Sequence, residues 1–149
     1  GSEMCIRDRK ERKQQFDEQI RIGIMIEIPA IALIADLAAE EVDFASIGSN
    51  DLTQYLSAAD RMNPEVAAYY KSDSTAMLRL LGFVFREFSK REKEISVCGE
   101  MAGNPETAQL LVGLGARKLS MSSGNIAGVK AKLAECTLQE LTALAEKKL

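Results

Sequence analysis

Short apolar runs alternate with amphipathic stretches along most of this chain. Four of the runs have the length and the aliphatic content of buried strands, and they are residues 21–27, 43–47, 94–97 and 117–121. The stretches that follow them repeat apolar residues at helical spacing, and they are residues 30–40, 52–59, 75–91, 105–114, 126–134 and 138–147. Strands that are each followed by a helix form right-handed βα units on a parallel sheet. The pattern therefore predicts an α/β fold.

Individual elements can be described more closely. The first run, RIGIMIE at residues 21–27, is apolar at most positions, as in parallel strands that are buried on both faces. Pro29 then opens the first helix, whose expected apolar face is Ile31, Ile34, Ala35 and Ala38. The longest helix, residues 75–91, has the clearest apolar face, which is Leu78, Leu81, Val84, Phe85 and Phe88. Asn104 and Gly115 are the expected cap and stop of the helix at residues 105–114.

Polar or small residues stand at the end of every predicted strand. They are Glu27, Asn50-Asp51, Cys98-Gly99-Glu100 and Ser122-Ser123. Open α/β sheets and α/β barrels present their binding and catalytic groups at this edge. A carboxylate at the position of Glu27 is costly to bury unless it is paired or metal-bound. For Asn50 and Asp51, capping of the next helix is an equally good interpretation.

A (β/α)8 barrel is the natural frame for strands whose ends all point the same way, but such a barrel needs roughly 250 residues. We therefore expect four parallel βα units that form half of a TIM-type barrel over residues 21–149. Residues 1–20 are charged and nearly free of apolar side chains, so they are expected to form at most an exposed helix or a frayed lead-in. Gly1-Ser2 has the character of a tag remnant, and residues 4–9 that of an artefact.

Composition excludes several classes of function. The 46% hydrophobic and 28% charged content is typical of a soluble globular protein. The net charge is -3 and no large basic cluster occurs, so we expect no nucleic-acid partner. The longest apolar run, residues 22–39, is interrupted by Glu27, Pro29 and Asp36, so we expect no membrane insertion and a cytoplasmic location.

Cysteine and histidine counts narrow the chemistry further. The three cysteines, Cys5, Cys98 and Cys136, are odd in number and have no paired spacing, which argues against a disulfide framework and against a zinc site. Histidine is absent, so the chain itself has no His acid/base chemistry, no His metal ligand and no phosphohistidine. Taken alone, Cys98 is most simply a buried structural cysteine, and Arg61 a surface ion-pair partner of Asp60.

Four motifs carry a specific resemblance. They are IMIEIP at residues 24–29, IGSNDLTQY at 47–55, ADR at 59–61 and CGEMAG at 98–103. In this order and spacing they resemble the carboxyl-terminal, phosphoenolpyruvate-binding barrel of the enzymes that use phosphoenolpyruvate, nearest to enzyme I of the bacterial sugar phosphotransferase system. The resemblance extends from about residue 21 to about residue 130 and covers the second half of that barrel.

The resemblance implies roles for the strand-end residues. Glu27 and Asp51 match the family's Mg²⁺ ligands, and hard oxygen ligands suit that ion. Asn50 and Asp51, with the adjacent backbone, match the turn that grips the substrate. Arg61 matches a phosphate-binding arginine, whose planar fork suits a phosphate.

Two further matches lie after the third predicted strand. Cys98 matches the general acid that protonates the methylene carbon of enolpyruvate, which a thiol can do because its pKa can be tuned by nearby charge. Gly99 matches a substrate-binding position at which the absence of a side chain lets the substrate come close to the backbone. Glu100 is expected to support the loop by hydrogen bonding rather than to bind a metal.

At the level of the whole protein, the resemblance implies a phosphotransferase. The parent enzyme transfers the phosphoryl group of phosphoenolpyruvate to its own histidine and on to a histidine-containing phosphocarrier protein, releasing pyruvate. Its barrel domain also forms homodimers. The present chain lacks the phosphohistidine domain and the first four barrel strands, so we expect the isolated chain to be inactive.

The chain departs from the family's pattern at two places, and two alternative interpretations of its function stay open. The family usually has a His-Pro pair within the segment that reads YYKSDSTAML at residues 69–78, and a glycine where Met62 stands. A fragment of pyruvate phosphate dikinase or of phosphoenolpyruvate synthase is one alternative. A non-catalytic half-barrel module that self-associates through open sheet edges at residues 22–27 and 117–121 is another.

Overall fold

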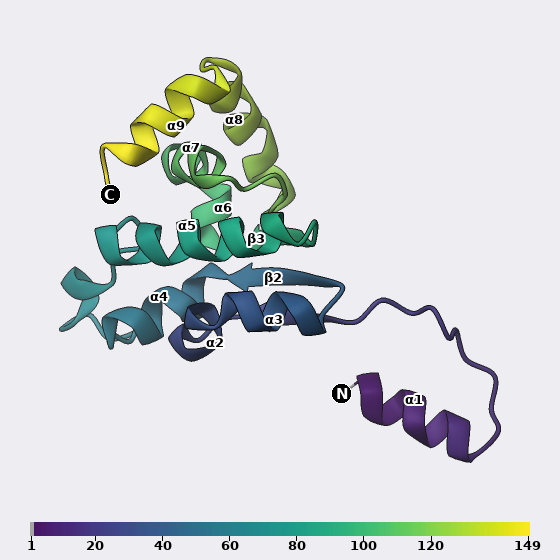
Figure 1. Cartoon of the computed structure of the whole chain (residues 1–149). Helices are drawn as coiled ribbons and strands as arrows, with labels where there is room; N and C mark the ends of the chain where they lie inside the picture. Colours follow the sequence, from purple (N-terminus) through teal and green to yellow (C-terminus); the bar gives the residue numbers. More distant parts are fainter. Residues whose placement is uncertain (1) are drawn as a thin grey trace.

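The computed structural model describes residues 2–149, without the side chains of residues 2, 3 and 5. One parallel sheet with strand order β1-β2-β3-β4 lies at its centre (Figure 1). The strands are β1 (Gly23–Ile26), β2 (Phe44–Gly48), β3 (Glu94–Cys98) and β4 (Leu119–Ser120). Parallel strands that alternate with helices confirm the predicted α/β class, and this arrangement is consistent with half of a (β/α)8 barrel.

Helices connect and follow the strands. They are α1 (Ser2–Glu11), α2 (Pro29–Leu33), α3 (Ala35–Glu41), α4 (Ser49–Ser57), η1 (Ala67–Tyr69), α5 (Thr75–Lys90), α6 (Glu100–Gly103), α7 (Pro105–Leu114), α8 (Ser123–Ala134) and α9 (Leu138–Glu146). Over residues 2–149, none of these helices has both the length and the apolar character that a membrane span requires.

The two faces of the sheet differ in burial. Ile26, Ile47 and Val97 stand side by side in neighbouring strands, and all three are fully buried beneath the helices. The alternate row, Met25, Ser46 and Ser96, lies on the opposite face and is only partly buried or exposed. The prediction that β1 is buried on both faces is therefore wrong. Met25 is 47% exposed because β1 is an edge strand whose second face points away from the helical layer.

Helix α5 is the centre of the core. Its predicted apolar face is confirmed, since Leu78, Leu81, Val84, Phe85 and Phe88 are all buried. The helix packs against α3 and α7 and against strand β3. Ser74 caps it by accepting a hydrogen bond from the backbone N–H of Met77.

The single helix predicted for residues 30–40 is wrong. It is divided into α2 and α3 at Ile34, which has a non-helical backbone (φ -111°, ψ 32°). The break turns Ile34 outward, so that it is 45% exposed, and leaves the buried face to small residues, Ala32, Ala35, Ala38 and Ala39. Alanine side chains let these short helices approach α5 closely, which apolar spacing alone could not show.

Helix ends were predicted with mixed success. Asn104 caps α7 as expected, because its Oδ1 accepts hydrogen bonds from the N–H groups of Glu106 and Thr107. Gly115 ends that helix at φ 118°, also as expected. The prediction that Asn50 or Asp51 caps α4 is wrong, since α4 begins earlier, at Ser49, and both residues lie in its first turn.

The amino-terminal segment lies apart from the sheet. Helix α1 is joined to β1 by an extended stretch of chain (Figure 1). Its described side chains are mostly exposed, as expected for the charged lead-in. Gly1 of the predicted tag remnant and the side chain of Cys5 lie outside the described residues, and the foreign origin of residues 1–9 stays a prediction.

Candidate functional site

The carboxyl ends of β2, β3 and β4 surround one polar hollow of about 380 Å³. Its lining residues are Asn50, Cys98, Gly99, Glu100, Ser120, Met121, Ser122 and Asn125. Three of the predicted site residues, Asn50, Cys98 and Gly99, are thus brought together by strands that are distant in the sequence. Glu27, Asp51 and Arg61 do not line this hollow, and their places are described below.

Two side chains of the first turn of α4 connect it to the end of β3. The buried hydroxyl of Ser49 donates a hydrogen bond to the carbonyl oxygen of Cys98 at 2.7 Å. The Oδ1 atom of Asn50 accepts one from the backbone N–H of Glu100 at 3.0 Å. The loop support that was expected from Glu100 therefore comes from its backbone amide.

Gly99 is required at this junction. Its φ of 109° lies in the left-handed region, which disfavours residues with a side chain. A Cβ atom here would lie 2.5 Å from Ser49 Oγ and 2.9 Å from Asn50 Oδ1. The close approach that the sequence predicted at Gly99 is thus made, in this structure, by the two α4 side chains.

Cys98 is half-buried beside the hollow. Its thiol donates a hydrogen bond to the carbonyl oxygen of Ile47 at 3.4 Å and lies 4.0 Å from the Sδ atom of Met25. A fully buried structural cysteine, the alternative from sequence, does not describe this position. Cys98 thus lines the hollow in part, while its sulfur is directed toward β1 and β2.

Glu27 follows β1 and reaches over the end of β2. A Cβ atom on Gly48 would lie 3.1 Å from the Cβ atom and 3.2 Å from the Oε2 atom of Glu27. Gly48 is paired with Cys98 in the neighbouring strand. The missing side chain of Gly48 therefore leaves room for the carboxylate of Glu27 at the same edge of the sheet as Cys98.

The charges of Asp51 and Arg61 both act on the hydroxyl of Tyr70. This hydroxyl donates a hydrogen bond to the backbone carbonyl of Asn50 at 3.2 Å. Burial raises the pKa of Tyr70, the negative charges of Glu100 and Asp51 raise that pKa further, and the Arg61 guanidinium opposes the shift. All three charged groups are thus close enough to influence one phenol.

The alternative role of Arg61 as the ion-pair partner of Asp60 is not what the structure shows. Asp60 instead accepts a hydrogen bond from the backbone N–H of Met62 at 2.9 Å. Among the ion pairs of the described residues, none joins Arg61 to Asp60.

The carboxylates do not form a complete metal site by themselves. Over the part of the chain that the structure describes, no group of three or more His, Cys, Asp or Glu side chains is placed to hold an ion. The metal role of Glu27 and Asp51 stays a prediction.

Sequence reasoning missed several members of this region. Met25 beside Cys98 was treated only as a strand residue, and Tyr70 lies in an irregular segment without periodicity. Asn125 in the first turn of α8 was not among the predicted site residues. Ser49 and Ser122 carried a signal, since both belong to polar clusters at predicted strand ends.

The fold and the hollow define a class: an α/β protein with its polar groups at the carboxyl ends of parallel strands. Residues 3–138 match the family described as PEP-utilising enzyme, PEP-binding domain. The chain belongs to this family.

Individual relatives are similar over most of the chain. Multiphosphoryl transfer protein 2 of Escherichia coli (strain K12) is 44% identical over 137 residues, which are 87% of this chain and 16% of that protein. The multiphosphoryl transfer protein of Xanthomonas campestris pv. campestris is 46% identical over 147 residues, 99% of this chain and 17% of that protein. Phosphoenolpyruvate-protein phosphotransferase of Bacillus subtilis (strain 168) is 43% identical over 134 residues, 90% of this chain and 24% of that protein.

The chain therefore spans only about a sixth to a quarter of the length of these relatives. All three are named as phosphoryl transfer proteins, so the chain is similar to part of a transferase.

Proposed function

We propose that this chain is the phosphoenolpyruvate-holding part of a phosphotransferase of the enzyme I type. In the whole protein, the phosphoryl group would pass to a histidine outside these residues and then to a phosphocarrier protein, with release of pyruvate. This reaction would serve sugar uptake in the cytoplasm. The observation that carries the proposal is the convergence of Asn50, Cys98 and Gly99 on one hollow at the strand ends.

Two residues are proposed to bind the phosphate. The Oδ1 atom of Asn50 is engaged by the N–H of Glu100, so its NH₂ group remains as a donor. Phosphate oxygens are acceptors, which suits that donor. Arg61, held near the same turn of α4, would add a charge-assisted contact.

Cys98 is proposed to be the proton donor. When the phosphoryl group leaves, the electron pair of the broken O–P bond remains on the enolate oxygen. The enolate then becomes pyruvate when its methylene carbon takes the thiol proton and the thiolate remains on Cys98. The half-buried position beside the hollow allows this contact.

The residues present fit a Mg²⁺ ion of the kind this family is expected to use. Glu27 and Asp51 offer carboxylate oxygens, and Gly48 leaves the space over β2 that a Cβ atom would otherwise fill. Two carboxylates alone hold Mg²⁺ weakly, because this ion keeps several waters and relies on substrate phosphate oxygens. When bound, the ion would neutralise charge on the phosphate and enolate oxygens.

Manganese titration tests the proposed site. Mn²⁺ binding, followed by its paramagnetic effect on water relaxation, is expected to be weak in the wild-type chain and tighter with oxalate, an analogue of enolpyruvate. Asp51→Ala should abolish the oxalate effect, whereas Asp36→Ala, an acidic residue of α3, should not. Equal binding by the wild-type chain and Asp51→Ala would contradict the metal role of Asp51.

A second function is favoured by a separate observation. Strands β1 and β4 are the two edges of the sheet, and the face that carries Met25 is open. We therefore also propose that the chain self-associates or pairs with a partner that covers this face.

The dikinase and synthase alternative concerns the parent protein. The names of the relatives favour the phosphotransferase. Sequence upstream of this segment in the same reading frame would decide, since a nucleotide-binding domain indicates the dikinase or synthase and a compact phosphohistidine domain alone indicates enzyme I.

A further inference from the structure

Gly99 lies between two peptide groups that are both held by side chains of α4. The peptide group before it is held at the carbonyl oxygen of Cys98, which accepts a hydrogen bond from the Ser49 hydroxyl at 2.7 Å. The peptide group after it is held at the N–H of Glu100, which donates to the Oδ1 atom of Asn50 at 3.0 Å. These contacts span 49 and 50 positions of the sequence. They fix both sides of the turn that leads from β3 into α6.

The turn is not fixed by its own backbone. Glycine can adopt more backbone conformations than any other residue, and Gly99 has a φ of 109° and a ψ of -172°. Because a peptide group is planar and stiff, the orientation of the Cys98 carbonyl is the starting point from which Gly99 places the N–H of Glu100. Without the bond from Ser49, this N–H would no longer be held in reach of Asn50.

The hydroxyl of Ser49 differs from the other buried hydroxyl of its helix. The side chains of Ser49 and Thr53 both belong to α4, and the two residues are 1% and 0% exposed. Thr53 donates to the backbone carbonyl of Ser49 at 2.7 Å, four positions back in the same helix, as Ser and Thr side chains in helices commonly do. The Ser49 hydroxyl instead crosses to the end of β3. Only this hydroxyl therefore connects α4 to the edge of the hollow.

We propose that Ser49 is a positioning residue that holds the turn at Gly99, so that the amide of Asn50 keeps one orientation. With its Oδ1 atom engaged by Glu100, Asn50 can offer its NH₂ group to a ligand in the hollow that it lines. An amide that turned over would present its oxygen instead, which repels the oxygens of a phosphate. This inference rests on the proposed function for its purpose, but not for its geometry.

The order of the Asn50 side chain tests the geometry without any ligand. In ¹⁵N NMR, the heteronuclear NOE of the Asn50 NH₂ group should report an ordered amide in the wild type, and a mobile amide there would overturn the proposal. In Ser49→Ala the NOE should fall towards the value of a mobile amide. Backbone amide signals of α5 and α7 verify the fold. If Ser49→Ala does not fold, Ser49→Cys, a weaker donor of similar size, takes its place.

Two matched variants separate this hydrogen bond from burial alone. Ser49→Thr keeps the hydroxyl and should retain an ordered Asn50 amide. Thr53→Val removes an equally buried hydroxyl from the same helix and should also leave Asn50 ordered, whatever its effect on the stability of the chain. An amide that stays ordered in Ser49→Ala, or that becomes mobile in Ser49→Thr or Thr53→Val, would overturn the proposal.

Ligand binding tests the purpose. With Mn²⁺ present, the apparent Kd for phosphoenolpyruvate should rise roughly three- to tenfold in Ser49→Ala, if Asn50 keeps its orientation for only a third to a tenth of the time. The Kd for oxalate, which has no phosphate group, should be unchanged. Thr53→Val should match the wild type for both ligands. Equal weakening of both ligands in Ser49→Ala would indicate a general loss of structure and overturn the specific role.

The two failures are distinguishable. A wild-type chain that does not bind phosphoenolpyruvate contradicts the proposed function, while the NMR result still judges Ser49. A mobile Asn50 amide with unchanged phosphoenolpyruvate affinity overturns the claim that this positioning serves binding.

Discussion

At the scale of single residues, the strand ends depend on positions that have no side chain. Gly48 leaves space for the Glu27 carboxylate, and Gly99 lets Ser49 and Asn50 reach the end of β3. Side chains of α4 can therefore form hydrogen bonds with the backbone at the end of β3. This proximity, rather than any single reactive residue, shapes the hollow.

Replacing Gly99 by alanine should destabilise the chain and distort the hollow. A positive φ and a clash with Ser49 are each disfavoured, and we expect a loss of about 1–3 kcal/mol in the free energy of unfolding. Urea denaturation followed by circular dichroism measures it. Gly124→Ala is the control, because a Cβ atom there meets nothing within 4 Å in helix α8, and it should be neutral or stabilising by roughly 0.5–1 kcal/mol. Equal effects of the two substitutions would contradict this account of Gly99.

At the scale of elements, a charged cluster ties α5 to α3. Glu87, with a side chain only 9% exposed, accepts hydrogen bonds from Lys90 at 2.9 Å and from Arg91 at 3.2 Å. Arg91 also binds Glu40 of α3 at 2.9 Å. The negative charge of the nearly buried Glu87 carboxylate is therefore balanced by Lys90 and Arg91 at the end of α5. Arg91 also connects this end of α5 to α3.

This cluster should make stability depend on pH. The hydrogen bond from Lys90 is the largest cause that lowers the pKa of Glu87 below 4.5, and Arg86 and Arg91 act in the same direction against burial. Because the folded pKa is the lower one, the stabilisation is complete above the unfolded value and is lost as the pH falls through the folded value. The difference in unfolding free energy between wild type and Glu87→Gln should thus be largest near neutral pH and vanish below the folded pKa.

Urea titrations at a series of pH values measure this difference. Glu65→Gln, at an exposed position between α4 and η1, is the control and should show no such trend. A difference for Glu87→Gln that stays constant down to pH 3 would show that the carboxylate contributes through packing and not through its charge.

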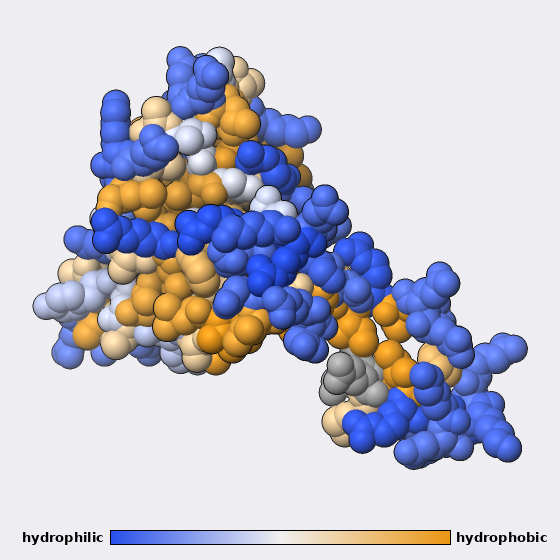
Figure 2. Space-filling model, in the orientation of Figure 1, coloured by the Kyte–Doolittle hydropathy of each residue, from blue (hydrophilic) through white to orange (hydrophobic). Residues whose placement is uncertain are grey.

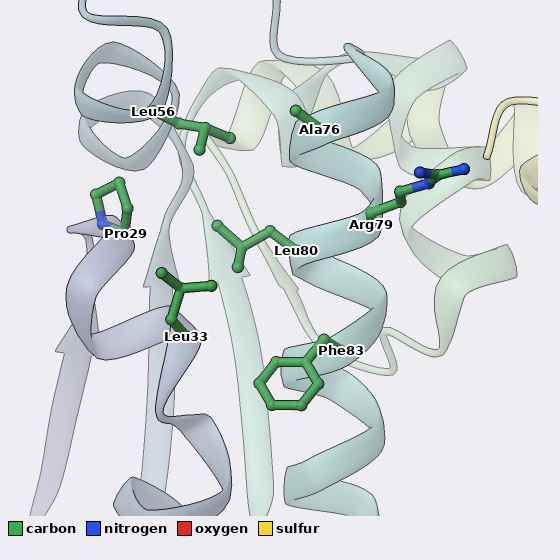
Figure 3. Close-up of a pocket in the computed structure, with 7 residues that line it drawn as sticks. All are labelled: Pro29, Leu33, Leu56, Ala76, Arg79, Leu80 and Phe83. Carbon is green, nitrogen blue, oxygen red and sulfur yellow. The ribbon is translucent and has the colours of Figure 1, made fainter.

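At the scale of the whole molecule, apolar surface remains on both sides of the sheet. Figure 2 shows hydrophobic side chains gathered over α2 and the start of α3, where Leu33 is 65% and Leu37 is 56% exposed. Between α2, α4 and α5 lies an apolar hollow of about 320 Å³, and Figure 3 shows Leu33, Leu56 and Leu80 directed into it. The other face of the sheet exposes Met25. Surfaces of this kind in a small chain mark contact sites for another protein or another copy.

Sedimentation should therefore detect self-association at micromolar concentration. If the open sheet face is responsible, Met25→Lys should shift the chain towards a monomer. A charge on this face opposes its burial against another sheet. Leu33→Glu, on the helical side, is the matched change and should leave the association intact. The opposite result would assign the contact to the apolar hollow of Figure 3, and a compact wild-type monomer would contradict self-association altogether.

The sequence by itself determined the features that depend on local pattern. The apolar face of α5, the Asn104 cap and the Gly115 stop of α7, and the order of the βα units could all be predicted. Each depends on residues within a few positions of one another, where spacing and backbone preference act directly. The strand-end positions of Asn50, Cys98 and Gly99 follow from the same logic, since parallel strands end at one edge.

Only the tertiary structure decided what depends on contacts between distant segments. Apolar spacing did not predict the break at Ile34, the exposure of Met25 or the earlier start of α4. The Tyr70 hydroxyl donates to the carbonyl of Asn50, which lies 20 positions away in the sequence. The Ser49 hydroxyl donates to the carbonyl of Cys98, which lies 49 positions away. Apolar periodicity carries no information on such pairs, because it records which residues avoid water and not which segments fold against each other.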